Sequence, residues 1–372
     1  MQNYPFTSLT ASLPSTVPFV GPETQERQIG KPFQARIGAN ESVFGPSPKA
    51  LEAMRLAASE VWRYCDPENY DLKQELAKLH GVRPDNIVVG EGIDALLGNL
   101  VRLMVSEQTP VVTSLGAYPT FNYHVAGFGG RLELVPYKDD KEDLEALLAA
   151  AMANSAPLIY LANPDNPMGS WHNANSVQTM INAVPEGSIL CLDEAYIEFA
   201  PELTAPPIDV DNPRVIRFRT FSKAFGMAGA RVGYGIAEAG LALAFNKVRN
   251  HFGVNSIAQA GALASVRDQN WLLNVRKLVE TSRFEIGRIA TANNLQPLDS
   301  AANFVAIDCG RDSAFARAIL NELVARGIFV RMPFAAPQDR CIRVSAGLPE
   351  NLAAFEKALP EAIDAANSSL IR

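Results

Sequence analysis

Short apolar runs alternate with longer amphipathic stretches through the middle of the chain. Runs rich in β-branched residues predict strands at 87–89, 111–113, 132–135, 158–161, 189–192 and 215–218. Helical spacing of apolar positions predicts helices at 48–62, 69–79, 93–105, 120–128, 141–151 and 175–183. Because alternating strands and helices build βα units, we expect an α/β fold whose mainly parallel central sheet is flanked by helices.

The pattern changes after about residue 266. We expect a long helix at 271–293, strands at 304–307, 328–330 and 341–344, a helix at 314–326 and a final helix, which together form a smaller α+β domain. Residues 1–47 are rich in Pro, Gly, Ser and Thr and predict an extended arm with turns, with a disordered tail as the alternative. The expected division is an arm (1–47) that contributes to dimer contacts and, through its first residues, to the small domain, then a large domain (48–265) and a small C-terminal domain (266–372).

Composition narrows the classes of function. The chain has 372 residues and a net charge of −7, which argues against a general nucleic-acid binder. The four cysteines and four histidines show no metal-ligand spacing, so we expect no metal site. The N-terminus lacks the pattern of a signal peptide, and no apolar run is long enough to span a membrane. We therefore expect a cytoplasmic protein without a membrane partner.

Polar clusters follow four of the expected strands, at 90–94, 163–169, 193–196 and 219–223. Each alone is equally typical of a turn, a helix cap or a solvated charge. In a parallel α/β sheet, however, the carboxyl ends of the strands share one edge, where ligands bind. Together the four loops offer a lysine, a carboxylate, a phenol, a carboxamide and the start of a helix. That combination suits a phosphorylated aromatic cofactor.

The spacing of these residues matches a known family. Asn166 precedes Asp193 by 27 residues, Asp193 precedes Lys223 by 30, and Lys223 precedes Arg231 by 8. With the segment 219–234, this resembles the fold-type-I aminotransferases that depend on pyridoxal 5′-phosphate (PLP). Within them, the segments 38–48 and 63–68 are similar to the histidinol-phosphate aminotransferase group, and the resemblance runs from about residue 35 to the C-terminus.

The resemblance implies roles around the cofactor ring. Lys223 would hold the PLP aldehyde as a Schiff base and then serve as general acid and base. Asp193 would pair with the pyridine nitrogen, while Tyr196 and Asn166 would bond the phenolic oxygen of the ring. Tyr118 would stack on the ring, its alternative being a plain core aromatic residue.

Other residues would hold the anionic groups. The backbone N–H groups of Ile93 and Asp94, at the start of a helix, would bind the cofactor phosphate. Thr220, Ser222 and Arg231 would add hydroxyl groups and a guanidinium.

The resemblance also implies residues from further along the chain. Tyr64 would reach the phosphate of the neighbouring subunit, which makes the active unit a homodimer with shared active sites. Arg343 would bind the substrate anion. Arg331 is a second candidate, with an ordinary surface arginine as the alternative, and Asn40 is a further substrate contact.

We therefore expect a PLP-dependent aminotransferase that acts on a small-molecule amino donor and a 2-oxo acid acceptor, with histidinol phosphate and 2-oxoglutarate as the favoured pair. The alternatives are an aromatic or other amino-acid aminotransferase, a PLP-dependent decarboxylase of a phosphorylated amino acid, and a non-catalytic PLP-binding regulatory module. No appended basic or DNA-binding segment supports the last. Four positions depart from the group's pattern: Ser42-Val43 replaces Asn-Pro, Met168 replaces Thr, and Ile93 replaces a small hydroxyl residue.

Overall fold

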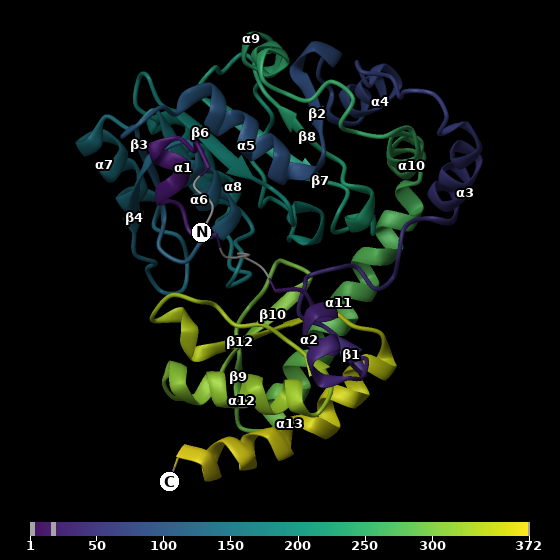
Figure 1. Ribbon diagram of the computed structural model, residues 1–372, viewed down its shortest axis with the longest axis vertical. Coiled ribbons are helices and arrows are strands. Elements are labelled where there is room, and N and C mark those ends of the chain that lie inside the picture. Colours follow the sequence, from purple (N-terminus) through teal and green to yellow (C-terminus); the bar gives the residue numbers. More distant parts are fainter. Residues whose placement is uncertain (1–3, 16–19, 371–372) are drawn as a thin grey trace.

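A computed structural model describes residues 4–15 and 20–370 of the chain. The described residues build a large unit around a seven-stranded sheet and a small unit around a three-stranded sheet (Figure 1). None of the helices in these residues is long and apolar enough to cross a membrane.

The sheet of the large unit has the order β2-β8-β7-β6-β5-β3-β4. Its strands are β2 (Ile87–Gly90), β3 (Pro110–Ser114), β4 (Arg131–Val135), β5 (Leu158–Ala162), β6 (Ile189–Asp193), β7 (Val215–Thr220) and β8 (Gly233–Ile236). The strands from β3 to β7 pair in parallel, and β8 runs antiparallel to both of its neighbours. The expected α/β fold with a mainly parallel central sheet is confirmed.

Strand β8 is absent from the sequence-based expectation because two of its four residues are glycines, which interrupt the apolar pattern. A Cβ at Gly233 would lie 2.6 Å from the backbone nitrogen of Ile93, and one at Gly235 would lie 2.8 Å from the ring of Phe218. The missing side chains therefore let β8 lie close to the start of the helix after β2 and to β7.

Helices cover both faces of this sheet. They are α4 (Tyr70–His80), α5 (Gly92–Met104), α6 (Pro119–Gly127), α7 (Leu144–Asn154), α8 (Ala174–Ala183), α9 (Ala239–Ala244) and α10 (Ser256–Val266), and α3 (Pro48–Ala57) packs on α10. Successive residues of a strand face opposite ways, so Leu158 and Tyr160 of β5 pack with α5 and α6, whereas Ile159 and Leu161 pack with α7 and α8. Short 3₁₀ helices lie at η1 (Ala58–Glu60), η2 (Pro84–Asn86), η3 (Ile197–Phe199), η4 (Ala228–Ala230), η5 (Phe245–Lys247) and η6 (Gln338–Arg340).

Helix α7 begins three residues later than expected. Asp143 caps it by accepting a hydrogen bond from the backbone N–H of Ala146, so the preceding residues form a turn instead of helix. The sequence pattern predicts no element within 239–266, whereas the structure has α9 and α10 there.

The small unit is α+β. Its sheet has the order β12-β10-β9, formed antiparallel by β9 (Gln296–Pro297), β10 (Phe304–Asp308) and β12 (Cys341–Ser345). Helices α12 (Ser313–Ala325) and α13 (Pro349–Leu370) pack on it, and α11 (Gln269–Ala292) extends from one unit to the other (Figure 1). Phe315, Ile319 and Phe355 are central to its apolar core.

The N-terminal arm is less extended than expected, and residues 1–3 and 16–19 of it lie outside the described residues. It contains α1 (Ser8–Ser12) and α2 (Pro22–Ile29), which begins at a proline and ends at the left-handed Gly30. In the described part of the arm, Leu9 lies beside Gly129 of the large unit. The last residues of the arm contact the small unit, since β1 (Ala35–Arg36) pairs with β11 (Ile328–Phe329).

Candidate functional site

A cavity of about 720 Å³ opens at the carboxyl edge of the large sheet, where residues of the small unit close it. Thirteen of the fourteen candidate residues line it: Asn40, Ile93, Asp94, Tyr118, Asn166, Asp193, Tyr196, Thr220, Ser222, Lys223, Arg231, Arg331 and Arg343. Because β8 separates β2 from β7 and runs opposite to both, the carboxyl end of β2 lies at the same edge as those of β5, β6 and β7. Tyr64 lies outside the cavity; its side chain is 85% exposed and its ring contacts Phe252.

Lys223 follows β7 at the base of this cavity. Its Nζ donates a 3.1 Å hydrogen bond to the backbone oxygen of Asn40 and lies 5.6 Å from the centre of the Tyr196 ring. Burial, and then the nearby positive charge of Arg343, lower the pKa of Lys223 to about 8. A substantial share of the amine is therefore neutral near physiological pH, as a nucleophile or base requires.

Asp193 is buried at the end of β6. The hydroxyl of Tyr160 donates a 2.8 Å hydrogen bond to its Oδ2, and the backbone N–H of Ala195 donates one of 3.0 Å to Oδ1. Burial raises the pKa of this carboxyl to about 6. It forms no ion pair with the described residues, so it is suited to a cationic N–H group of a ligand, such as a protonated ring nitrogen.

An anion site lies at the start of α5. Its N-cap, Glu91, makes no side-chain capping bond, which leaves the first N–H groups of the helix free for a ligand. Arg231 points its guanidinium there, so that a Cβ at Gly92 would lie only 2.6 Å from it. Ser222 accepts a 3.3 Å hydrogen bond from Arg231, and its own N–H donates to the hydroxyl of Thr220. Backbone donors, hydroxyl groups and a guanidinium thus gather where a phosphate would fit.

Three further candidate residues lie near this anion site. Ile93 and Asp94 lie in the first turn of α5, as expected, but the Asp94 carboxylate pairs with His124 at 3.0 Å. Tyr118 is the N-cap of α6, half-buried at the cavity wall, and burial raises the pKa of its phenol to about 12. A neutral phenol ring in this position can stack on a planar ligand.

Arg343 enters the cavity from β12 of the small unit. It donates one hydrogen bond to the side-chain oxygen of Asn166 and another, of 3.1 Å, to the backbone oxygen of Gly38. Its Nε is buried without a partner among the described residues, and burial lowers the pKa of Arg343 to about 10. A guanidinium without a carboxylate partner is suited to the anion of a substrate. Asn166 therefore contacts Arg343, a partner that the sequence did not indicate.

Arg331 lies beside Arg343, and their backbones exchange hydrogen bonds of 3.2 and 2.6 Å. Its guanidinium donates to the backbone oxygen of Val20, in the arm. Asn40 donates a 3.1 Å hydrogen bond to the hydroxyl of Tyr196 and accepts one of 2.9 Å from Ser345. In this structure Asn40 thus orients the phenol of Tyr196.

Sequence reasoning missed several groups that support the site. Tyr160 lies within an apolar strand, where a tyrosine is usually a core residue. Glu194 is buried between Arg217 and Arg219, at 2.5 and 2.8 Å. Burial opposes its ionisation, but the two guanidinium groups lower the pKa of Glu194. The sequence signal for this buried cluster is the pair Arg217 and Arg219, two charged residues in a strand that is otherwise largely apolar.

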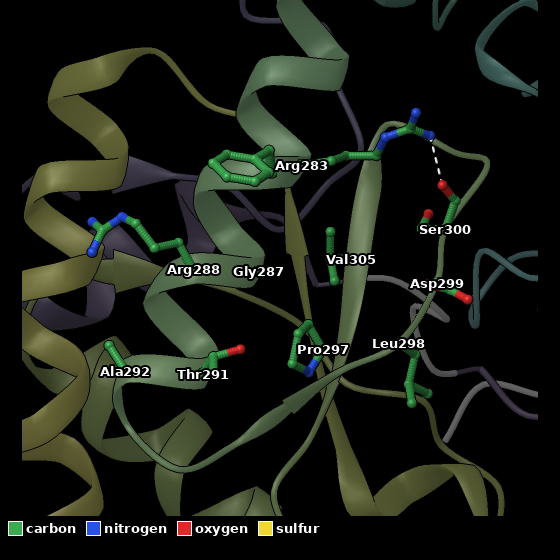
Figure 2. A pocket seen from close by; sticks show the side chains of 11 residues that line it. Arg283, Gly287, Arg288, Thr291, Ala292, Pro297, Leu298, Asp299, Ser300 and Val305 are labelled. Carbon is green, nitrogen blue, oxygen red and sulfur yellow. Dashed lines mark hydrogen bonds between the residues drawn. The ribbon is translucent and has the colours of Figure 1, made fainter.

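A second cavity, of about 700 Å³, lies in the small unit between α11 and the segment 297–300 (Figure 2). Arg283 crosses its edge and donates a 2.7 Å hydrogen bond to the backbone oxygen of Ser300. None of the candidate residues lines it. The described residues contain no cluster of His, Cys, Asp and Glu that could hold a metal ion.

Comparisons with known proteins agree with this geometry. A sequence profile of the family "Aminotransferase class I and II" matches residues 34–359. The chain is 33% identical over 337 residues to histidinol-phosphate aminotransferase 2 of Carboxydothermus hydrogenoformans, covering 90% of this chain and 92% of that protein.

Solved structures show the same relationship. The crystal structure of histidinol-phosphate aminotransferase from Sinorhizobium meliloti, in complex with pyridoxal-5′-phosphate, has a TM-score of 0.95 and 56% sequence identity, with 98% of each chain covered. The aspartate aminotransferase from Rhizobium meliloti shares the fold, with a TM-score of 0.81 at 18% identity and coverage of 98% of this chain and 100% of that one.

Proposed function

The chain belongs to the class I and II aminotransferases, the PLP-dependent transaminases of fold type I, and we propose that it moves the amino group of histidinol phosphate to 2-oxoglutarate. The observation that carries the proposal is that Lys223, Asp193, the start of α5 and the guanidinium of Arg343 line one and the same cavity. The identity of 56% to a histidinol-phosphate aminotransferase supports the choice of substrate.

The cavity suits PLP, which when bound supplies an electron sink for the charge that develops at the substrate Cα. Lys223 would attach the cofactor through its amine and, once displaced by the substrate, carry the proton to and from Cα. The lowered pKa of Lys223 favours this role, since a base works best when its pKa lies near the working pH.

Asp193 would keep the ring nitrogen protonated. Its burial and its hydrogen bond from Tyr160 place a carboxylate where water cannot screen it. Tyr118 would cover one face of the ring. Tyr196, oriented by Asn40, would donate to the phenolic oxygen of the ring.

The two ends of the cavity would hold two anions. The start of α5, with Thr220, Ser222 and Arg231, would bind the cofactor phosphate. Arg343, with Arg331 beside it, would bind the anion of the substrate. Asn166 would hold the guanidinium of Arg343 in place as well as contact the cofactor.

We also propose a homodimer in which Tyr64 completes the partner's phosphate site. Tyr64 is 85% exposed, and its neighbours Val61 and Trp62 are 59% and 77% exposed. Such a run of exposed apolar residues is typical of a surface that a protein partner covers. Mixing Tyr64→Ala with Lys223→Ala subunits tests this, because mixed dimers with shared sites would recover one intact site, whereas independent sites would show only the residual activity of Tyr64→Ala.

The test of the function is the donor profile of the purified enzyme loaded with PLP. We expect kcat/KM for histidinol phosphate to exceed that for phenylalanine or tyrosine by about tenfold or more, a gap of roughly 1.4 kcal/mol in transition-state binding. An aromatic amino acid that outperforms histidinol phosphate would refute the substrate assignment. Release of carbon dioxide in place of a 2-oxo product would identify the decarboxylase alternative.

A further inference from the structure

The segment 331–340, here called the strap, contributes its first four residues to the lining of the cavity. At its first residue the backbone of Arg331 pairs with that of Arg343. At its end Arg340 forms ion pairs of 2.7 Å with Asp140 of the large unit and with Asp308 of the small unit. The strap is thus attached to both units.

The middle of the strap is also held in place. A Cβ at Gly116, in the large unit, would lie 2.9 Å from the Cβ of Ala335, so the two backbones approach closely there. Gly116 has a φ of 101°, a conformation that other residues rarely adopt. The contact lies two residues from Tyr118, which we assign to the cofactor ring. Ala335 therefore fixes the position of its neighbour Phe334 at the cavity mouth.

Phe334 lines the cavity and is 59% exposed. Among the described lining residues it is the one large hydrophobic side chain that is exposed. Its ring has no aromatic or cationic partner among the described residues. An exposed apolar ring at the edge of a cavity gains contact when a ligand covers it.

In the proposed function, the polar groups of the cavity bind the cofactor and the substrate anion. Lys223 and Asp193 face the cofactor, and Arg343 faces the substrate anion. A donor that carries both an anion and a ring needs a further subsite that is flat and apolar. Glutamate, the amino acid formed from 2-oxoglutarate, has no ring to place there.

We propose that Phe334 determines donor specificity by packing against the ring of the amino donor. The proposal rests on the function proposed above, and it predicts that Phe334 affects only the half-reaction of the ring-bearing donor. Each half-reaction is measured separately, by single-turnover absorbance of the bound cofactor with histidinol phosphate and with glutamate.

For Phe334→Ala we expect kcat/KM for histidinol phosphate to fall about tenfold or more, while that for glutamate stays within about twofold. Phe334→Tyr keeps the ring and should restore the histidinol-phosphate rate. On a Lys223→Ala background, which cannot complete turnover, calorimetry should show a matching loss of affinity for histidinol phosphate. Phe284→Ala is the matched control, because Phe284 is 75% exposed and lines the second cavity.

A loss shared equally by both donors would mean that Phe334 only positions the strap, and it would overturn the proposal. Unchanged rates would overturn it as well. If the wild type prefers another donor to histidinol phosphate, the substrate assignment fails. The effect of Phe334→Ala is then compared between glutamate and the ring-bearing donor that the wild type uses best. An enzyme that uses no ring-bearing donor contradicts both proposals.

Discussion

Tyr160 offers a direct test of how Asp193 is kept charged. Replacing Tyr160 by Phe removes the hydroxyl that donates a 2.8 Å hydrogen bond to Oδ2 of Asp193 and leaves the ring in place. The ring packs on Phe121 with their centres 4.5 Å apart, and this contact should survive the change. Any effect on cofactor binding therefore reports on the hydrogen bond, not on lost packing.

The expected size follows from the type of bond. A hydrogen bond to a charged group contributes about 1.5–3 kcal/mol, and each ~1.4 kcal/mol is a factor of ten. We expect PLP affinity and the half-reaction rate of Tyr160→Phe to fall together by about tenfold or somewhat more. Asp193→Asn removes the charge itself and should lower the half-reaction rate by at least ~10²-fold. Tyr160→Phe should therefore be the milder of the two.

The pH dependence gives a second signature. The hydrogen bond from Tyr160 lowers the pKa of Asp193, which burial has raised to about 6, so the variant should have a still higher pKa. At pH 6 the Asp193 carboxyl of the wild-type apoenzyme is about half ionised, whereas that of the variant is mostly protonated. Above pH 8 both are ionised. The defect in PLP affinity should be largest near pH 6 and shrink as the pH rises.

The assay is a titration of the apoenzyme with PLP, followed by visible absorbance at several pH values. Tyr137→Phe is the matched control, since it removes a 2.8 Å hydrogen bond from a tyrosine to a different buried carboxylate, Asp165. The reasoning is refuted by a loss as large as that of Asp193→Asn, by a defect that does not vary with pH, or by an equal defect in Tyr137→Phe.

Three further predictions concern other parts of the site. Borohydride should fix PLP to the peptide that contains Lys223, and label on another lysine would contradict this. The reactivity of the Lys223 amine in the apoenzyme should rise with pH through a pKa of about 8. Arg343→Lys should lower kcat/KM for the preferred donor by about tenfold or more, because an ammonium cannot make two parallel hydrogen bonds. An unchanged donor profile would indicate that Arg331 binds the anion instead. Glu194→Gln should lower the free energy of unfolding, measured by urea titration, by about 3–5 kcal/mol, because it leaves two guanidinium groups buried without their counter-charge. A variant as stable as the wild type would show that water reaches the two guanidinium groups.

The local pattern of apolar residues predicted most of the strands and helices, whereas the resemblance to the aminotransferases indicated most of the candidate residues. Strands of four or more apolar residues were identifiable wherever they were continuous, as at β5 and β6. Strand β8 was not, because its glycines serve packing against Ile93 and Phe218 and carry no apolar signal. The same is true of α2, which is marked by Pro22 and Gly30 instead of by an apolar stripe.

The sequence by itself determined the α/β class, the sheet edge at which the polar loops meet, and the lysine and carboxylate that lie there. These follow from short-range periodicity and from the rule that the ends of parallel strands share one edge, whereas the arginines were implied by the resemblance to the aminotransferases. Only the tertiary structure decided the pairing of residues far apart in the chain. Arg343 meets Asn166 across 177 residues, and Asn40 meets Ser345 across 305. Such contacts arise where the small unit packs against the large one, and that packing depends on the shapes of both apolar cores, which no local pattern of residues encodes.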